Sequence, residues 1–433
     1  MAETATCFAE FGGEKMIYDA RMGPAAVDDG QRVVIVYQGG EGQAVGQPHV
    51  TAYDRDKATW STPMQLGEVS RRNHHFMPII WQDDALYWHV LYHCHFSPGV
   101  HLVGRSPHAL DAWHSAEPIG PSISYPSIHR LGDGRRLLVY RVEGHLGYWV
   151  YRLSDDGGRS WAPERLLLDF DHDAQDGADR WAGSYLLPHL SRDGQSVHIG
   201  FCYWDERNGC HPRYRFKRDL LTRYHLYYLK LNPDTGELAT IHGQGLDAPV
   251  NRRTAEAAKV LDTGDELTNF PTVATDEHDH PMLIAPVSES DPWRCRFHCL
   301  RWDGADWQHS TITETDNTWN ASRVVDWQDE RITADLIVGR DKGEDCFYGG
   351  GELQRWTSDD NGLNWRYQRS FVPAEGLLYN NPRPVERTAG GVLDDAFVLH
   401  GWQGPGGVWK TPGYDTPDHN RAMAWLWLDG RWV

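Results

Sequence analysis

Several short stretches of the sequence combine side chains that transfer protons with side chains that bind acidic groups. Histidine and tyrosine can exchange protons with a substrate, and an arginine guanidinium binds a carboxylate through two parallel hydrogen bonds. These stretches are Asn73-His74-His75, His93-Cys94-His95, Tyr125-Pro126, Tyr140-Arg141 and Trp204-Asp205-Glu206-Arg207. A base, an acid and a cation are what β-elimination at a uronic acid requires, because the proton that leaves lies beside the carboxylate. The residue types therefore predict a proton-transfer site for an acidic sugar.

The elements that must position these residues are β-strands. Short runs rich in Val, Ile, Tyr and Trp alternate with turns that contain Gly and Asp, as in GQRVVIVYQGG and DGRRLLVYRVEG, and helical periodicity is almost absent. This pattern is typical of a many-stranded antiparallel protein. The 20 tryptophans and 19 tyrosines suit sheets that pack face to face. We therefore expect an all-β fold.

Two segments, Ser154–Trp161 and Ser358–Trp365, share the pattern S-x-D-x-G-x-x-W. In such a hairpin the Asp carboxylate accepts hydrogen bonds from turn amides, and glycine adopts the positive φ that the turn needs. Both segments resemble the Asp boxes, or BNR repeats, of sialidase-like propellers, which join the third and fourth strands of a blade. Degenerate copies lie at Asp54–Trp60 and Pro107–Trp113.

With the Asp boxes as anchors, the chain divides into repeats of roughly 50–65 residues, somewhat longer than WD-type blades. The first strands are expected to begin near Gly23, Phe76, Tyr125, Ser184, Asn269, Ala321 and Asn381. We predict one seven-bladed β-propeller domain over residues 1–433. Ala422–Val433 should close the ring against the N-terminal segment around Lys15–Ala20, because closure removes exposed sheet edges.

Strand order assigns the proton-transfer residues to one face of this ring. If the Asp-box turns lie on one face, the loops between second and third strands and the starts of the first strands lie on the other. Histidine, tyrosine and arginine side chains from three consecutive blades then share one arc of that other face. A single histidine more often has a structural role, but the combination favours a functional site. Arg152, two residues before an Asp box, is expected toward the opposite face.

Composition limits the partners of the chain. The formal net charge of −19 argues against nucleic acid, because nucleic-acid binding requires a basic surface. No apolar run approaches the roughly 18 residues that a membrane helix needs. The start of the chain, MAETATCFAEFGG, lacks the features of a signal peptide, so both a cytoplasmic and a secreted location stay open. Seven scattered cysteines do not indicate a disulfide framework.

The order NHH…YHCHF…SYP…VYR…SDDGGRSW…WDER resembles the BNR-type polysaccharide lyases. These are seven-bladed enzymes that cleave ulvan or the rhamnosyl-glucuronate linkages of plant gums. The resemblance implies a uronate-containing polysaccharide as partner and a secreted or periplasmic location. It also implies that His75 and His95 are the active-site histidines and that Tyr140 is the catalytic tyrosine, acting as acid and base. The expected substrate-binding residues are Arg141, Arg207, Tyr125 and Trp204.

Two other functions are compatible with the same motifs. An α-L-rhamnosidase-type glycoside hydrolase can use this fold, and so can a glycan-binding propeller without catalysis. A lyase leaves a double bond in its product, a hydrolase adds water without one, and a binding protein leaves the glycan intact. The presence of Tyr140 together with His75 and His95 favours the lyase, because a lectin does not need a proton-transfer set.

A second group of potential ligands surrounds a later strand. Asp276, His278 and His280 precede the strand PMLIAPV, and Cys299 lies on the strand that returns beside it. A hairpin of these strands would place His280 opposite Cys299, with His298 as a substitute for Asp276. Nitrogen, sulfur and oxygen ligands together suit Zn²⁺, and the lyase resemblance implies a structural zinc in such a blade. The alternative is a solvated turn above buried cysteines.

Overall fold

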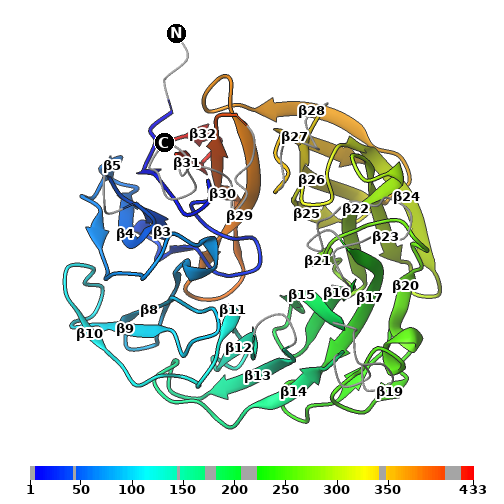
Figure 1. Cartoon of the computed structure of the whole chain (residues 1–433), viewed down its shortest axis with the longest axis horizontal. Coiled ribbons are helices and arrows are strands. Elements are labelled where there is room, and N and C mark those ends of the chain that lie inside the picture. Colours follow the sequence, from blue (N-terminus) through cyan, green and yellow to red (C-terminus); the bar gives the residue numbers. More distant parts are fainter. Residues whose placement is uncertain are drawn as a thin grey trace.

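The computed structural model describes residues 5–41, 45–143, 147–170, 182–205, 222–340, 348–404 and 421–433. These residues form six hydrogen-bonded sheets and two short 3₁₀ helices, η2 (His74–Phe76) and η6 (Thr254–Ala258). The sheets are arranged in a ring around a central axis, with successive sheets following the chain (Figure 1). The all-β expectation is therefore confirmed.

Five sheets follow one another along the chain, each built from antiparallel strands that pair mainly with their neighbours in sequence. The first contains β7 (Ile79–Gln82), β8 (Trp88–Tyr92), β9 (Val100–Gly104) and β10 (Trp113–Ser115). The second contains β11 (Ser124–Arg130), β12 (Arg136–Arg141), β13 (Trp149–Ser154) and β14 (Arg165–Leu168). The third contains β15 (Ala182–Leu190), β16 (Val197–Asp205), β17 (Arg223–Leu231), β18 (Leu238–Ala239), β19 (Gly245–Leu246) and β20 (Lys259–Leu261). The fourth contains β21 (Thr272–Thr275), β22 (Pro281–Asp291), β23 (Arg294–Trp302) and β24 (Trp307–Thr315). The fifth contains β25 (Ser322–Gln328), β26 (Arg331–Val338), β27 (Glu352–Ser358) and β28 (Arg366–Phe371).

The remaining sheet has ten strands and joins the two ends of the chain. Its N-terminal strands are β1 (Ala9–Glu10), β2 (Ala26–Asp28), β3 (Arg32–Gly39), β4 (Gln47–Asp54), β5 (Thr59–Trp60) and β6 (Met64–Gln65). Its C-terminal strands are β29 (Leu378–Arg387), β30 (Val392–Trp402), β31 (Ala422–Leu428) and β32 (Arg431–Trp432). One parallel pair, β2 with β29, links two otherwise antiparallel sets of strands.

The strand that closes the ring at the N-terminal end is β1, which pairs with β31 through Ala9↔Ala424 and Glu10↔Met423. The expected partner, the segment around Lys15–Ala20, is therefore wrong. That segment instead turns toward the central axis, where Asp19 and Ala20 line a cavity. Short apolar pairing strands are hard to distinguish from other short apolar runs by sequence pattern alone.

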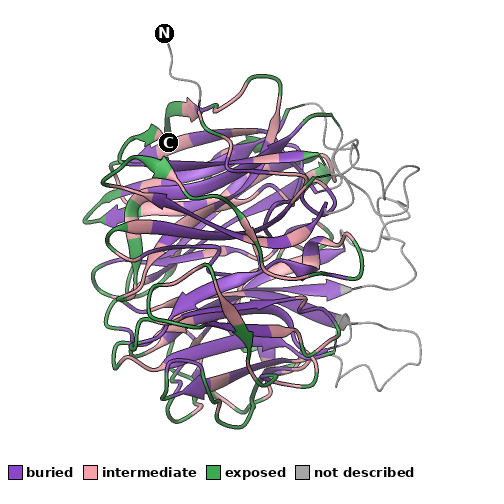
Figure 2. Cartoon of the chain, turned by 90° about the vertical axis from the view of Figure 1, so that its left-hand side faces the viewer, coloured by how far each residue is buried: buried purple, intermediate pink, exposed green. Residues whose placement is uncertain are grey.

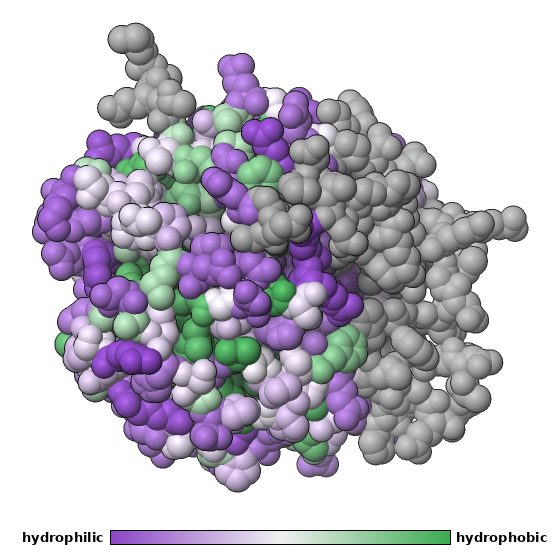
Figure 3. All heavy atoms as spheres, turned by 60° about the vertical axis from the view of Figure 1, so that its left-hand side comes forward, coloured by the Kyte–Doolittle hydropathy of each residue, from purple (hydrophilic) through white to green (hydrophobic). Residues whose placement is uncertain are grey.

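Strands near the axis are apolar on both faces because each sheet packs between two others. All six residues of β12, RLLVYR, are buried. Figure 2 shows buried residues along the strands through the depth of the molecule, with exposed residues mainly at turns and outer strands. On the side that carries β4, β5 and β10, Figure 3 shows a largely hydrophilic surface with smaller apolar areas between polar ones.

Both Asp boxes join the third and fourth strands of their sheets, as predicted. In the first, Ser154 Oγ donates to Asp156 Oδ1 and accepts from the amide of Gly158, both at 2.8 Å. Asp156 Oδ1 also accepts from the amide of Ser160 at 2.8 Å. Ser358, Asp360 and Gly362 repeat the arrangement between β27 and β28. These turns mark the face opposite the loops that join second to third strands.

Candidate active site

Five of the seven residues predicted for catalysis and substrate binding meet at the face opposite the Asp boxes. Each comes from the end of a strand or from a loop between strands: η2 precedes β7, His95 follows β8, Tyr125 lies at the start of β11, and Arg141 and Trp204 lie at the ends of β12 and β16. The structure brings together His75, His95, Tyr125, Arg141 and Trp204 through the contacts described below. Arg207 lies outside the described residues.

The centre of this arrangement is a pair of stacked histidines. The rings of His75 and His95 lie 4.1 Å apart with 9° between their planes. Tyr125 presents its ring edge-on to both, at 5.4 Å from His75 and 5.8 Å from His95. His75 is partly exposed, whereas His95 is 8% exposed and Tyr125 is 1% exposed. His75 is therefore the member of the pair that a substrate can reach most easily.

Asn73 holds the imidazole of His75 in one orientation. Its Oδ1 lies 2.6 Å from His75 Nδ1 and also accepts the amide of His75 at 2.9 Å, as the N-cap of η2. A side-chain amide oxygen can only accept, so His75 must donate from Nδ1. The basic lone pair of a neutral His75 then lies on Nε2, which is the form a general base needs.

A buried polar network lies directly beneath the pair. His74 packs against His75 with ring centroids 3.8 Å apart and 37° between the planes. Its Nδ1 contacts the carboxylate of Glu14, and its Nε2 lies 3.1 Å from Arg21 Nη2. Asp19 binds Arg21 with both carboxylate oxygens. Although burial opposes it, Arg21 and His74 lower the pKa of Asp19 to about 2, so this carboxylate stays ionised.

Three arginines surround the aromatic rings next to this network. The guanidinium carbons of Arg21, Arg141 and Arg223 lie 5.6, 4.7 and 4.5 Å from the ring centre of Tyr185. Arg141 is fully buried, and within the described residues its Nε and Nη2 have no hydrogen-bond partner. Its Nη1 donates to the carbonyl of Ser184 at 3.5 Å. Burying the two remaining nitrogens without partners is costly, and the negative faces of the rings offset part of that cost. The arrangement maintains a positive potential behind the histidine pair.

Predicted substrate-binding residues therefore support the site from behind. Arg141, Tyr125 and Trp204 are 0%, 1% and 1% exposed, and Trp204 packs against Tyr185 at 5.2 Å. Direct contact of these three side chains with a polymer does not follow from this geometry. These three side chains pack beneath His75, and Arg141 adds positive charge there.

Three residues around the same site have left-handed backbone. Tyr125, His93 and Phe96 have φ values of 54°, 60° and 55°. Bulky side chains rarely adopt this left-handed conformation, and residues held in it cluster at functional sites. Here the conformation turns the loop after β8 and the start of β11 toward each other.

Tyr140 belongs to a different set of contacts. It precedes Arg141 on β12, so the two side chains point to opposite faces of the sheet. The Tyr140 hydroxyl donates to Glu164 Oε1 at 2.5 Å, and the guanidinium of Arg152 lies beside it. Burial, with the Glu164 hydrogen bond, raises the pKa of Tyr140 well above its ordinary value. The hydroxyl therefore stays protonated at neutral pH.

Arg152 begins where the sequence predicts and its guanidinium donates to the carbonyls of Trp161 and Ala162 at the Asp box, but it also reaches Tyr140. Its Cα does lie on β13, opposite Leu138 and away from the strand end, but its long side chain reaches the loop before β11 and contacts the carbonyl of Ile119. Its Nε donates to the carbonyl of Ala162 at 2.6 Å. Strand position fixes where a side chain begins, and a flexible arginine can end several ångströms away.

The sequence patterns do not single out Arg21, Arg223 or the Glu14–His74 contact. Arg21 comes shortly before β2 and Arg223 opens β17, which are the same kinds of position that singled out Tyr125 and Arg141. Applying the strand-end rule to every repeat would have found both arginines. The Glu14–His74 contact joins residues 60 positions apart, so no local sequence pattern predicts it.

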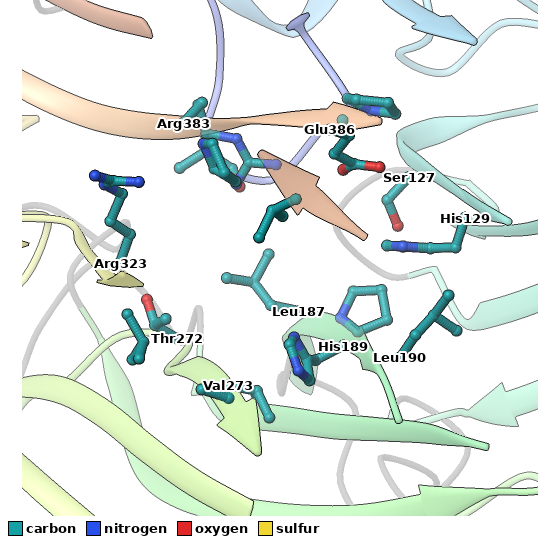
Figure 4. Close-up of a pocket in the computed structure, with 18 of the residues that line it drawn as sticks. Ser127, His129, Leu187, His189, Leu190, Thr272, Val273, Arg323, Arg383 and Glu386 are labelled. Atoms are coloured by element: carbon teal, nitrogen blue, oxygen red, sulfur yellow. The ribbon is translucent and has the colours of Figure 1, made fainter. Parts of the chain in front are cut away.

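A cavity of about 800 Å³ runs along the axis toward the Asp-box face. Figure 4 shows Ser127, His129, His189, Arg323, Arg383 and Glu386 among its lining residues. Burial raises the pKa of Glu386 to about 7, despite the charges of Arg383 and Arg136. Burial and nearby positive charge lower the pKa of His129 to about 4 and of His189 to about 3, so both are neutral at physiological pH.

The four predicted zinc ligands do not fit a metal site. The hairpin register places Cys299 opposite Ile284 and not His280. Asp276 Oδ1 instead caps the turn, accepting the amides of His278 and His280 at 2.9 and 2.8 Å. His278 points outward with 70% of its side chain exposed, and Cys299 is buried. No group of three or more His, Cys, Asp or Glu side chains in the described ranges is placed to hold a metal.

His298 does not substitute for Asp276 either. Its Nδ1 lies 2.8 Å from Nε2 of His309 on the neighbouring strand β24. Burial, with the charge of His309, lowers the pKa of His298 to about 4. Zinc therefore stays a prediction without a supporting site among these residues.

No helix in the described part of the chain is long and apolar enough to span a membrane.

Solved structures with this fold include ulvan lyases. An ulvan lyase of polysaccharide lyase family PL25, bound to -[GlcA(1-4)Rha3S]-, superposes with a TM-score of 0.77 at 18% identity, covering 97% of this chain and 94% of its own. The polysaccharide lyase Uly1 superposes with a TM-score of 0.63 at 13% identity, covering 97% and 96%. At these identities the likeness shows the fold.

Sequence comparison gives related proteins. The ulvan lyase PL25 of Pseudoalteromonas sp. (strain PLSV) is 24% identical over 321 residues, which are 66% of this chain and 62% of that protein. The ulvan lyase of Alteromonas sp. (strain LOR) is 24% identical over 380 residues, covering 78% and 73%. The match thus spans less than two thirds of the first relative. The model of the BNR repeat-containing family matches residues 26–315, well over half of the sequence, and the chain belongs to this family.

Proposed function

We propose that this protein is a polysaccharide lyase that cleaves ulvan or a similar polymer at a uronic acid next to rhamnose. The observation that carries the proposal is the stacked pair His75–His95 with Asn73 bound to Nδ1 of His75. This pair presents an oriented base at the face where propeller loops converge. The relatives named ulvan lyase support the choice of substrate.

The proposed reaction is a β-elimination. His75 Nε2 removes the proton on C5 of the uronate, beside its carboxylate. The electron pair forms the C4–C5 double bond, and the bond from C4 to the glycosidic oxygen breaks. The leaving oxygen takes a proton from an acid. The product is an unsaturated uronate at one new chain end and a hydroxyl at the other, with no water consumed.

Positive charge stabilises the intermediate carboxylate. Removing the C5 proton spreads negative charge over the carboxylate oxygens, so a fixed positive potential lowers the barrier. Arg21, Arg141 and Arg223 supply that potential from behind the histidine pair, with Asp19 as the carboxylate bound to one of them. Arg207 remains a predicted direct ligand of the substrate.

Tyr140 remains the proposed acid. Its raised pKa keeps the hydroxyl protonated and suits proton donation to an alkoxide leaving group, which is strongly basic. The Tyr140 side chain is 0% exposed, so it must leave its contact with Glu164 and move outward before its hydroxyl can reach a substrate. Tyr125 is the competing tyrosine, because its ring contacts both histidines.

The sheet arrangement supports a seven-bladed propeller when the ten-stranded sheet is counted as two blades. Its two antiparallel sets meet at the single parallel pair β2–β29, and each set then resembles one of the five other sheets. Together these make seven blades in one domain. The lyase proposal also favours a secreted or periplasmic location, since ulvan is an extracellular polymer.

The product tests the function. Incubating the protein with ulvan should raise ultraviolet absorbance as the conjugated double bond forms, and mass spectrometry should find products without added water. Products that carry added water would instead identify the α-L-rhamnosidase-type hydrolase. Binding without any new product would identify a glycan-binding propeller.

A further inference from the structure

Phe96 is an exposed aromatic ring at the edge of the histidine pair. It is 55% exposed, the highest value among the large hydrophobic side chains that the structure describes as exposed. Its ring meets that of His95 edge-on, with centroids 4.3 Å apart and 76° between the planes. An apolar ring is therefore exposed to solvent and separated from the proposed base, His75, by the side chain of His95.

The backbone that presents Phe96 is strained and firmly held. Phe96 has a φ of 55°, which disfavours a bulky side chain. Its amide donates to Ser124 Oγ at 3.3 Å, and the next carbonyl, of Ser97, accepts the amide of Ile123 at 2.8 Å. The Ser97 hydroxyl also bonds the carbonyl of His93. These contacts tie the loop after β8 to the approach of β11, so the ring is displayed on a rigid support.

A purely structural role does not account for this combination. Left-handed backbone is most easily made by glycine, and an exposed ring gains little from burial. A phenylalanine in this strained backbone position is consistent with a residue that contacts a bound ligand. Rigid aromatic rings are frequent in binding sites because they supply contact area with little loss of side-chain entropy.

We propose that Phe96 is a specificity-determining residue that stacks on the apolar face of the deoxysugar next to the cleaved uronate. The inference rests on the proposed function. Rhamnose lacks the C6 hydroxyl and carries a methyl group, so it offers an apolar surface that a uronate lacks. The related lyase was solved with -[GlcA(1-4)Rha3S]-, in which the two sugars alternate. With the uronate over His75, the neighbouring rhamnose lies over Phe96.

Steady-state kinetics on ulvan oligosaccharides test this role. Phe96→Ala should raise KM about tenfold, equivalent to about 1.4 kcal/mol, and leave kcat within about twofold, because uniform binding is lost and proton transfer is not. Phe96→Trp should restore most of the affinity by supplying another ring. Phe96→Gly should fold at least as stably, since glycine accepts this φ, and should still show the raised KM.

Leu363 provides a matched control. It is 54% exposed and lies in the second Asp box, on the face away from the histidines. Leu363→Ala should leave KM unchanged. An unchanged KM in both Phe96→Ala and Phe96→Gly, with active wild-type enzyme, would overturn the inference and leave the lyase proposal intact. If the wild type makes no unsaturated product, the proposed function itself fails.

Discussion

The imidazoles of His75 and His95 lie face to face, 4.1 Å apart, because the start of β7 and the end of β8 pair at the open end of one hairpin. Two protonated rings at this separation would repel each other. Catalysis by the pair therefore needs at least one neutral ring, and Asn73 prepares His75 for that role.

Removing either ring should abolish most activity. We expect His75→Ala to lower kcat on ulvan by about 10²–10⁴-fold, the usual contribution of a general base. His95→Ala should have a smaller effect, since it removes the stacking partner and not the proposed base. Ultraviolet absorbance of the unsaturated product measures both. Equal activity of His75→Ala and wild type would exclude His75 as the base.

Asn73 should act as a positioning residue. Asn73→Ala frees the His75 ring to change tautomer, and we expect kcat to fall about tenfold or more with little change in KM. Asn73→Asp places a negative charge at the same hydrogen bond, which favours protonated His75 and should move the acidic limb of the pH–rate profile to higher pH. A merely structural role in capping η2 would lower stability in Asn73→Ala, change it little in Asn73→Asp because Asp also caps helices, and leave that limb in place.

The roles of Tyr140 and Tyr125 can be distinguished by removing the hydroxyl of each in turn. We expect Tyr140→Phe to remove detectable lyase activity and Tyr125→Phe to retain much of it, because Tyr140 is the proposed acid. Each variant's melting temperature controls for folding, since the Tyr140 hydroxyl also bonds Glu164. The reverse pattern would transfer the acid role to Tyr125, which contacts both histidines.

Glu386 should make stability depend on pH. Its pKa is about 7 in the folded chain, against an ordinary 4.5, because burial beside the axial cavity disfavours the charged carboxylate. The folded state thus keeps a proton that the unfolded state releases. The stability associated with this proton is complete below about pH 4.5 and is lost as pH rises through about 7.

Glu386→Gln replaces the titrating group with a neutral one. At pH 8 we expect its free energy of unfolding to exceed that of wild type by about 3 kcal/mol, with the difference disappearing near pH 4. Urea denaturation at both pH values measures this change. The exposed Glu237→Gln is the control and should show no such trend. A Glu386→Gln difference that is the same at both pH values would contradict the raised pKa.

Much of the architecture follows from local sequence. Alternating apolar residues identified the strands, and S-x-D-x-G-x-x-W identified turns whose hydrogen bonds depend only on neighbouring residues. Because strand order then fixes which ends share a face, the sequence also predicted that His75, His95, Tyr125, Arg141 and Trp204 belong together. Local periodicity and turn chemistry carry this information without any knowledge of distant contacts.

Tertiary structure decided what those residues do for one another. It buried Arg141 and Trp204 behind the histidines, brought Glu14 to His74 across 60 positions, and carried the Arg152 guanidinium to Tyr140. It also set a hairpin register that separates Cys299 from His280. Register, side-chain reach and burial depend on packing between sheets, and packing involves residues far apart in the chain. The sequence by itself determined the strands, their turns and the shared face, whereas only the folded ring determined exposure, charge pairing and the orientation of the proposed base.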